Sequence, residues 1–125
     1  MATEVVLVRP EVAALGAGLL RERIRVPAHF DAEVLAALRR SLRLRRIDEE
    51  QALIAVFHLH ALRAERVALR PLVAGAFALR DRIGVYDASY AIVARLSEAT
   101  LLTSDRGLAR AAKGYCKVEY VALSS

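Results

Sequence analysis

Two aspartates of this chain stand next to predicted buried elements, where a carboxylate can bind a cation. Asp105 follows residues 100–103 (T-L-L-T), a short apolar run that is typical of a strand buried on both faces. Asp87 precedes apolar residues at helical spacing, so we predict it at the N-cap of an amphipathic helix. Ligands of parallel α/β sheets collect at the carboxyl ends of the strands. Because Mg²⁺ and Mn²⁺ prefer carboxylate oxygens, the two aspartates predict a candidate metal site at that edge.

The elements that must position these residues alternate between strands and helices. We expect strands over residues 4–8, 66–70, 100–103 and 117–123. We expect helices over residues 11–23, 49–62 and 71–82, and others that begin at Asp31, Asp87 and Asp105. Asp48 and Gln51 form a D-x-x-Q capping box for the helix over 49–62, and Gly114 suits a left-handed helix end. The alternation predicts one domain over residues 1–125, with three α/β/α layers around a mostly parallel sheet.

The charge balance is basic, with 19 Lys and Arg against 14 Asp and Glu and a pI of about 10.0. A basic domain favours polyanionic partners such as nucleic acid, but a GC-rich genome that encodes Arg in place of Lys explains the composition equally well. No apolar run approaches the ~20 residues of a membrane span, and no secretory leader is recognisable, so we expect a cytoplasmic protein. The single Cys116 excludes an internal disulfide and cannot form a zinc site alone.

Three motifs resemble those of one protein family. The segments Y-D-A-S-Y at residues 86–90 and L-L-T-S-D-R-G-L-A at residues 101–109 resemble the C-terminal half of PIN-domain ribonucleases, especially the VapC-type toxins. Upstream, D-A-E-V-L-A-A-L-R-R at residues 31–40 resembles the segment that carries the helical glutamate of that family. The motifs stand in the order of the family between about Leu20 and Leu123, and together they are more specific than any one alone.

The resemblance implies an Mg²⁺-dependent endoribonuclease, with Mn²⁺ as the alternative ion, that hydrolyses RNA phosphodiester bonds. Such a cation activates water and neutralises charge on the phosphorus. The resemblance implies that Glu33, Asp87 and Asp105 hold the metal and that Thr103 helps in catalysis by positioning a water or an aspartate. Two alternatives stay open: a first-turn Glu33 also favours the helix dipole, and Thr103 is also ordinary β-branched filling of a strand.

The resemblance also implies partners. These are an RNA substrate, a second copy in a homodimer and a small antitoxin protein. Arg39, Arg40 and Arg43 are candidates for contacts with RNA phosphates, although charged helix ends are usually just solvated. The helix over residues 52–62 is apolar nearly all round, which predicts a surface that another chain covers. His58 and His60 face different sides of this helix, so they do not share a metal there.

The start of the chain departs from the family pattern. A PIN domain places an aspartate directly after its first strand, as one metal ligand, but Val8, Arg9 and Pro10 stand there in this sequence. Arg9 offers a positive charge that could neutralise the remaining acids in place of a metal. The alternative function is therefore a catalytically degenerate PIN-like protein that acts as a binding or regulatory module.

Overall fold

The computed structural model describes residues 4–7 and 23–121, and side chains from Arg23 onward. The expectations for Arg9 and for the helix over residues 11–23 lie outside these residues, apart from Arg23, which belongs to a strand. In the described part of the chain, no helix is long and apolar enough to cross a membrane.

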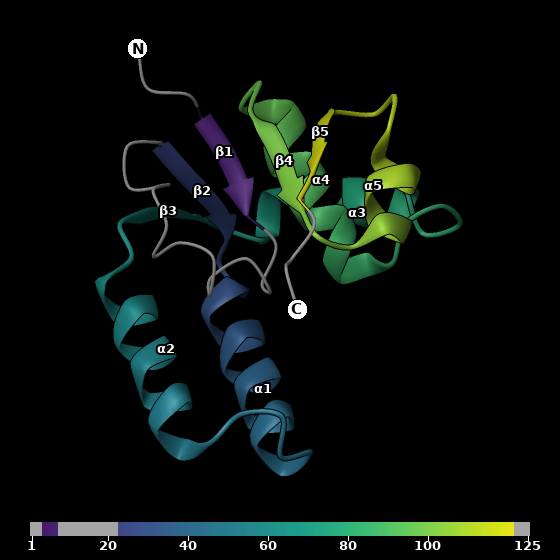
Figure 1. The fold of residues 1–125 in the computed structure, drawn as a ribbon. Coiled ribbons are helices and arrows are strands. Elements are labelled where there is room, and N and C mark those ends of the chain that lie inside the picture. The colour runs from purple at the N-terminus through teal and green to yellow at the C-terminus, as the bar shows by residue number, and fades with distance from the viewer. Residues whose placement is uncertain (1–3, 8–22, 122–125) are drawn as a thin grey trace.

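A five-stranded parallel sheet forms the centre of the fold (Figure 1). Its strands lie in the order β3-β2-β1-β4-β5, and every described pair is parallel. The bounds are Glu4–Leu7 for β1, Arg23–Pro27 for β2, Ala64–Val67 for β3, Thr100–Thr103 for β4 and Lys117–Tyr120 for β5. In the central register, Val6 of β1 is opposite Arg25 of β2 and Leu101 of β4. The predicted three-layer α/β/α class with a mostly parallel sheet is confirmed.

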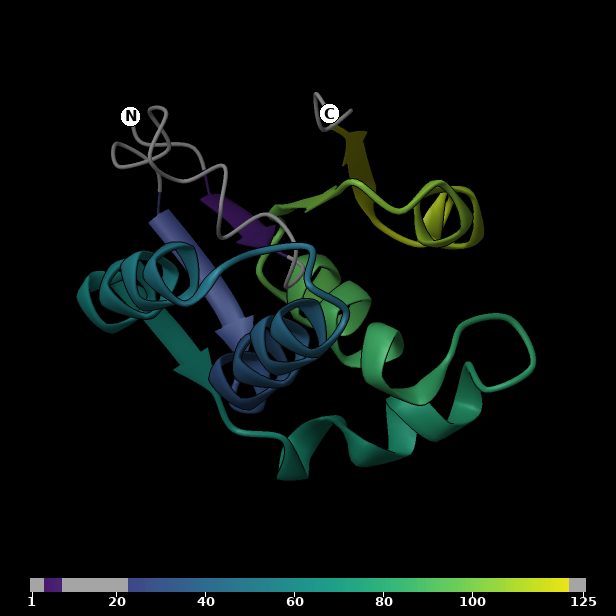
Figure 2. The same ribbon diagram turned by 60° about the horizontal axis from the view of Figure 1, so that its bottom comes forward.

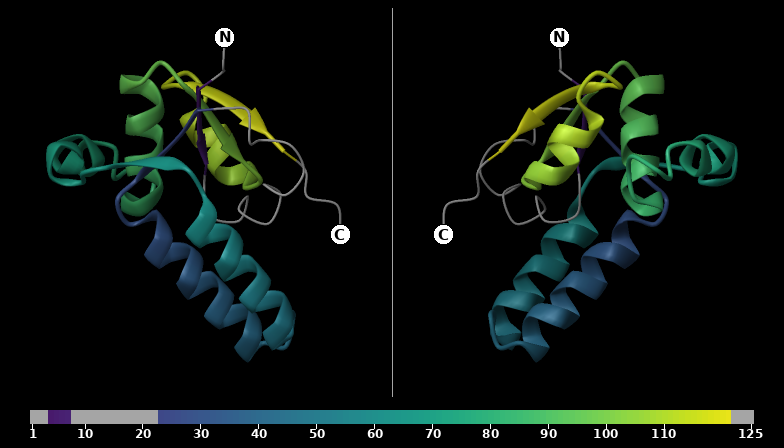
Figure 3. Two further views of the ribbon diagram at one scale, coloured as in Figure 1. Left: turned by 90° about the vertical axis from the view of Figure 1, so that its left-hand side faces the viewer. Right: turned by 90° about the vertical axis from the view of Figure 1, so that its right-hand side faces the viewer.

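Helices lie on both sides of the sheet, and two further helices form a pair that projects from it. Their bounds are Phe30–Arg43 for α1, Glu49–Ala61 for α2, Arg70–Leu72 for the 3₁₀ helix η3, Val73–Ala78 for α3, Val85–Leu96 for α4 and Arg106–Ala112 for α5. Figure 3 shows α4 and α5 on opposite sides of the strands. The helices α1 and α2 pack against each other and extend away from the sheet as an arm (Figures 1 and 2).

The centre of the core is α4, which packs against β1, β2 and β4. All seven residues from Ala88 to Ala94 are buried. The small side chains of Ala88, Ala91 and Ala94 let the helix backbone approach the sheet closely, because none of them needs more than a methyl group of space. On its other side α4 contacts α3, where a side-chain carbon added to Gly75 would meet Ile92 Cδ1 at 3.0 Å.

Several expected boundaries are confirmed. Asp48 caps α2 in a complete capping box, with its Oδ1 accepting from the Gln51 backbone N–H at 2.7 Å and the Gln51 Oε1 accepting from the Asp48 N–H at 2.9 Å. Asp105 caps α5, and Gly114 adopts a φ of 88° just after that helix. The strand over residues 100–103 is β4.

Other expectations about elements are wrong. No strand is expected over Arg23–Pro27, yet this segment is β2, in which Ile24 and Val26 are buried and Pro27 is the last residue. The strand expected over residues 66–70 is β3 at Ala64–Val67, and the helix expected over 71–82 divides into η3 and α3 and ends at Ala78.

Two expected N-caps are also wrong. Helix α1 begins at Phe30 after His29, and α4 begins at Val85 after Gly84, so Asp31 and Asp87 lie in first turns. The side chain of Asp31 does not cap its helix. Instead it accepts two hydrogen bonds from Arg66, at 2.8 and 3.1 Å, which tie α1 to β3.

Candidate active site at the carboxyl edge of the sheet

The three candidate carboxylates belong to elements that meet at one edge of the sheet. Glu33 lies in the first turn of α1, which begins shortly after β2 ends, and Asp105 follows β4. Helix α4 leads into β4 and crosses the sheet in the opposite direction, so its first turn with Asp87 lies at the carboxyl ends of the strands. Glu33 follows β2 and Asp105 follows β4. Because β1 lies between these two strands, β2 and β4 are about two strand spacings, or ~10 Å, apart.

Among the described residues, Tyr90 and His29 contact the carboxylate of Glu33. The Tyr90 hydroxyl on α4 donates a hydrogen bond to Glu33 Oε1 at 2.6 Å. His29 Nε2, one helical turn before Glu33, lies 2.9 Å from the same oxygen. The Glu33 and His29 side chains are 16% and 14% exposed, so both contacts are largely shielded from water.

The hydroxyl of Ser89 determines how His29 bonds. Ser89 Oγ donates to the Tyr86 carbonyl at 2.6 Å, and since a hydroxyl has one proton, Oγ can only accept from His29 Nε2 at 3.3 Å. Nε2 therefore carries the hydrogen and shares it between Glu33 and Ser89. The other ring nitrogen, Nδ1, is buried and has no hydrogen-bond partner among the described residues.

Asp105 is fixed by its helix and by Thr103. Asp105 Oδ1 accepts from the Leu108 backbone N–H at 3.0 Å, which is the N-cap bond of α5. The fully buried Thr103 accepts from the Asp105 backbone N–H through Oγ1, also at 3.0 Å. The Thr103 hydroxyl thus stabilises the turn before Asp105 with a hydrogen bond that an apolar side chain at this position could not make.

The carboxylates fit a hard divalent cation in kind, because Mg²⁺ and Mn²⁺ are bound by carboxylate and water oxygens. The carboxylates do not form a complete metal site by themselves. Within residues 4–7 and 23–121, no three His, Cys, Asp or Glu side chains form a group that could hold a metal ion. Asp87, half-buried in the first turn of α4, is favourably placed relative to the positive end of that helix dipole.

Most of the chain matches the model of one protein family. A family model described as PIN domain matches residues 5–114 of the chain. This chain belongs to the PIN-domain family.

Its relatives are of the VapC type. "Ribonuclease VapC12" of Mycobacterium tuberculosis is 32% identical over 121 residues, which cover 97% of this chain and 94% of that protein. "Ribonuclease VapC3" of the same species is 39% identical over 99 residues, covering 79% of this chain and 72% of that protein. The crystal structure of PAE2754 from Pyrobaculum aerophilum superimposes with a TM-score of 0.73 at 27% identity, covering 94% of this chain and 92% of that one. The predicted resemblance to PIN-domain proteins of the VapC type is confirmed.

The arginines named as candidates for RNA contacts lie on the arm of this PIN domain. Arg39, Arg40 and Arg43 are all exposed on the second half of α1. At 1.5 Å per residue, Arg43 stands about 15 Å beyond Glu33 along the helix axis. Arg39 and Arg40 are nearer, six and seven residues after Glu33, which is about 9 and 10.5 Å or less than two helical turns. Helix α1 itself extends away from the sheet as part of the arm (Figure 1).

The residues that the sequence analysis missed are the partners of Glu33. The spacing of His29 and Glu33 is i and i+4, so their contact on one helix face is visible in the sequence. The contact between Tyr90 and Glu33 cannot be recognised from the sequence, because the two residues are 57 positions apart.

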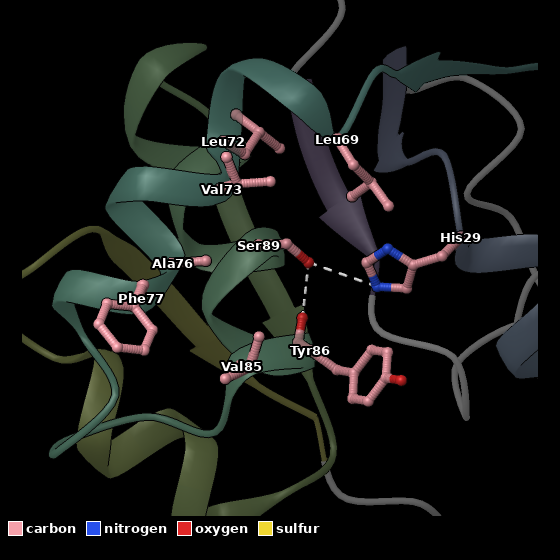
Figure 4. Close-up of a pocket in the computed structure, with 9 residues that line it drawn as sticks. All are labelled: His29, Leu69, Leu72, Val73, Ala76, Phe77, Val85, Tyr86 and Ser89. Carbon is pink, nitrogen blue, oxygen red and sulfur yellow. Dashed lines mark hydrogen bonds between the residues drawn. The ribbon is translucent and has the colours of Figure 1, made fainter.

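His29, Tyr86 and Ser89 also line an apolar cavity of the PIN domain, with a volume of about 260 Å³ (Figure 4). Its other walls come from η3, α3 and the start of α4. The rim is apolar and open to solvent, since Phe77 is 62% and Tyr86 68% exposed.

Proposed function

We propose that this PIN domain is a divalent-metal-dependent endoribonuclease that hydrolyses RNA phosphodiester bonds. The observation that supports it most is the arrangement of Glu33, Asp87 and Asp105 on three elements that meet at the carboxyl edge of the sheet. The relatives named ribonucleases supply the reaction class. Mg²⁺, or Mn²⁺ in its place, would supply water activation and charge neutralisation at the phosphorus.

The chain's own residues have separate roles in this proposal. Glu33, Asp87 and Asp105 hold the cation, directly or through water. Thr103 fixes the turn before Asp105 and so fixes the direction of its carboxylate. Arg39, Arg40 and Arg43 contact RNA phosphates along the arm, where Arg side chains are exposed and free to make bidentate bonds.

The proposed partners are an RNA substrate, a second copy of the chain and a small antitoxin protein, in the cytoplasm. The apolar side chains on α2 support an interface with another chain: Leu53 is 62%, Ile54 51% and Phe57 68% exposed. Large apolar groups that gather on one surface are typical of protein interaction sites.

The test is cleavage of a labelled RNA by purified protein with Mg²⁺. We expect cleavage that EDTA abolishes and that falls at least about 100-fold in Asp105→Asn and in Glu33→Gln, because each change removes one carboxylate charge. Asp81→Asn is the matched control, since Asp81 is exposed and lies outside the site, and this variant should keep full activity. Equal cleavage by all four proteins, or cleavage that survives EDTA, would overturn the proposal.

A second candidate function is a catalytically degenerate PIN-like module that binds or regulates without cleaving. It is favoured by one observation, the presence of Val8, Arg9 and Pro10 after β1 in place of the family's aspartate. Purified wild-type protein that binds RNA or an antitoxin but cleaves no RNA in Mg²⁺ or Mn²⁺ would favour this function.

A further inference from the structure

We propose that Tyr90 and His29 are positioning residues, which fix the orientation of the Glu33 carboxylate for the reaction. The inference rests on the proposed function, in which Glu33 takes part in cleavage. Neither residue belongs to the carboxylate set, and each acts through Glu33.

Tyr90 is suited to this role by burial and by chemistry. Its side chain is fully buried, and its ring packs edge-on against Phe30 and His29, with ring centroids 6.5 and 5.4 Å apart. The hydroxyl therefore has little freedom to move. A buried tyrosine hydroxyl needs a partner, and a bond of 2.6 Å to a carboxylate is in the range of strong charge-assisted hydrogen bonds.

His29 contacts the same oxygen of Glu33 as Tyr90 does. The proton of Ser89 is committed to the Tyr86 carbonyl, so Nε2 of His29 must donate, and the donor faces Glu33 Oε1 at 2.9 Å. The ring itself is held by edge contacts with Tyr86 and Tyr90, at 5.6 and 5.4 Å between centroids. Ser89 thus selects the tautomer that lets His29 bind Glu33.

Two donors on one oxygen restrict Glu33 in a way that one donor would not. Tyr90 belongs to α4, whereas His29 is the N-cap of the helix that carries Glu33. Rotating the Glu33 carboxylate so that Oε1 leaves this position therefore breaks the bond to α4 and the bond to His29 at once. A glutamate side chain otherwise has several rotatable bonds, and orienting contacts of this kind are typically worth 10–100-fold in metal affinity or activity.

The main test compares Tyr90→Phe with Tyr120→Phe in the full chain. The first change removes only the oxygen that binds Glu33. The second removes an exposed hydroxyl that binds Arg106 and serves as the matched control. For Tyr90→Phe we expect a 10–100-fold fall in kcat with little change in KM, and a comparable fall in Mn²⁺ affinity measured by electron paramagnetic resonance. Tyr120→Phe should match wild type in both measurements.

If Tyr90→Phe lowers the melting temperature, variants of His29 provide a second test of the same inference. His29→Gln keeps an N–H donor and should retain more activity than His29→Leu, which has none. In metal-free protein, ¹⁵N NMR should show the Nε2–H tautomer of His29. Glu33→Gln should shift that signal and leave the signals of the exposed His58 and His60 unchanged.

The outcomes separate this inference from the proposed function. If Glu33→Gln loses cleavage and Mn²⁺ binding while folded Tyr90→Phe and His29→Leu keep both, the positioning role is wrong and the nuclease proposal stands. If wild-type protein neither cleaves RNA nor binds Mn²⁺, the proposed function fails and the positioning role fails with it, whatever the NMR signals show.

Discussion

Arg9 is the residue at which the proposed nuclease and the proposed degenerate module predict different behaviour. It stands two positions after the last residue of β1, where the family pattern has a carboxylate. Glu33 and Asp105 follow β2 and β4, the two strands that flank β1. A cation at that position would instead compete with a metal for the same acids.

Replacing Arg9 with Asp should therefore increase Mg²⁺ affinity and raise RNA cleavage. The gain in affinity is measured as a rise in melting temperature with Mg²⁺, since a ligand at a hundredfold its Kd stabilises the fold by about 2.7 kcal/mol. Arg9→Ala, which removes the cation without adding an acid, should give a smaller increase. An Arg9→Asp protein that folds but matches wild type in both Mg²⁺ response and cleavage would show that position 9 is irrelevant to the site.

The thiol of Cys116 should react slowly in the folded protein. Burial raises the pKa of this thiol, and the positive charge of Arg95 only partly offsets the shift. Because the thiolate is the reacting form, we expect slower modification by a thiol reagent at pH 8 than in urea-unfolded protein, with the native rate rising as the pH rises above about 9. Equal rates for folded and unfolded protein would contradict the shift.

The same raised pKa links Cys116 to stability at high pH. Above the ordinary pKa of 9.0 the unfolded chain loses the thiol proton before the folded chain does. Stability contributed by the neutral buried thiol is thus complete below that pH and is lost as the pH rises through the folded pKa.

At the scale of elements, α2 combines a complete N-terminal cap with few buried side chains. Only Ala52 and Leu59 of this helix are buried, so burial holds it less firmly than α4. The capping box satisfies backbone N–H groups at its start, at Asp48 and Gln51. Helix ends of this kind leave several donors unsatisfied when the cap is lost.

Asp48→Ala should accordingly destabilise the fold by about 1 kcal/mol, which lowers the melting temperature by roughly 4 °C in a domain of this size. Asp48→Asn is the control, because asparagine caps helices about as well as aspartate. Thermal unfolding followed by circular dichroism measures both. The prediction is wrong if the alanine and asparagine variants melt at the same temperature.

At the scale of the whole molecule, the exposed apolar side chains of α2 point to self-association. Leu53, Ile54 and Phe57 are each more than half exposed, and covering them removes apolar area from water. We expect light scattering to give the mass of a dimer at high micromolar concentration. Phe57→Asp, at a residue that is 68% exposed, should shift the protein towards monomer.

Leu96→Asp is the control for this change, because Leu96 is 72% exposed but lies at the end of α4 rather than on the α2 surface. A wild-type protein that is a clean monomer at that concentration would refute the dimer. If both variants dissociate the dimer equally, α2 has no special part in the contact.

The sequence by itself determined the elements whose signals are local. The T-L-L-T run became β4, and the caps at Asp48 and Asp105 are present because a cap needs only a side chain and the backbone three residues on. The alternation of strands and helices was enough for the parallel α/β class. The motifs around Glu33, Asp87 and Asp105 were enough for the family.

Only the tertiary structure decided what each element contacts. Strand β2 was missed although residues 23–26 (R-I-R-V) alternate between polar and apolar residues, because a helix was expected up to residue 23. The segment is a strand because β1 and β3 pair with it on both sides. The bond between Tyr90 and Glu33 joins residues 57 positions apart, and it exists because α4 packs across β2 next to the start of α1. Local patterns determine where helices and strands form. Contacts between distant side chains depend on how those elements pack, and no short stretch of sequence encodes that packing.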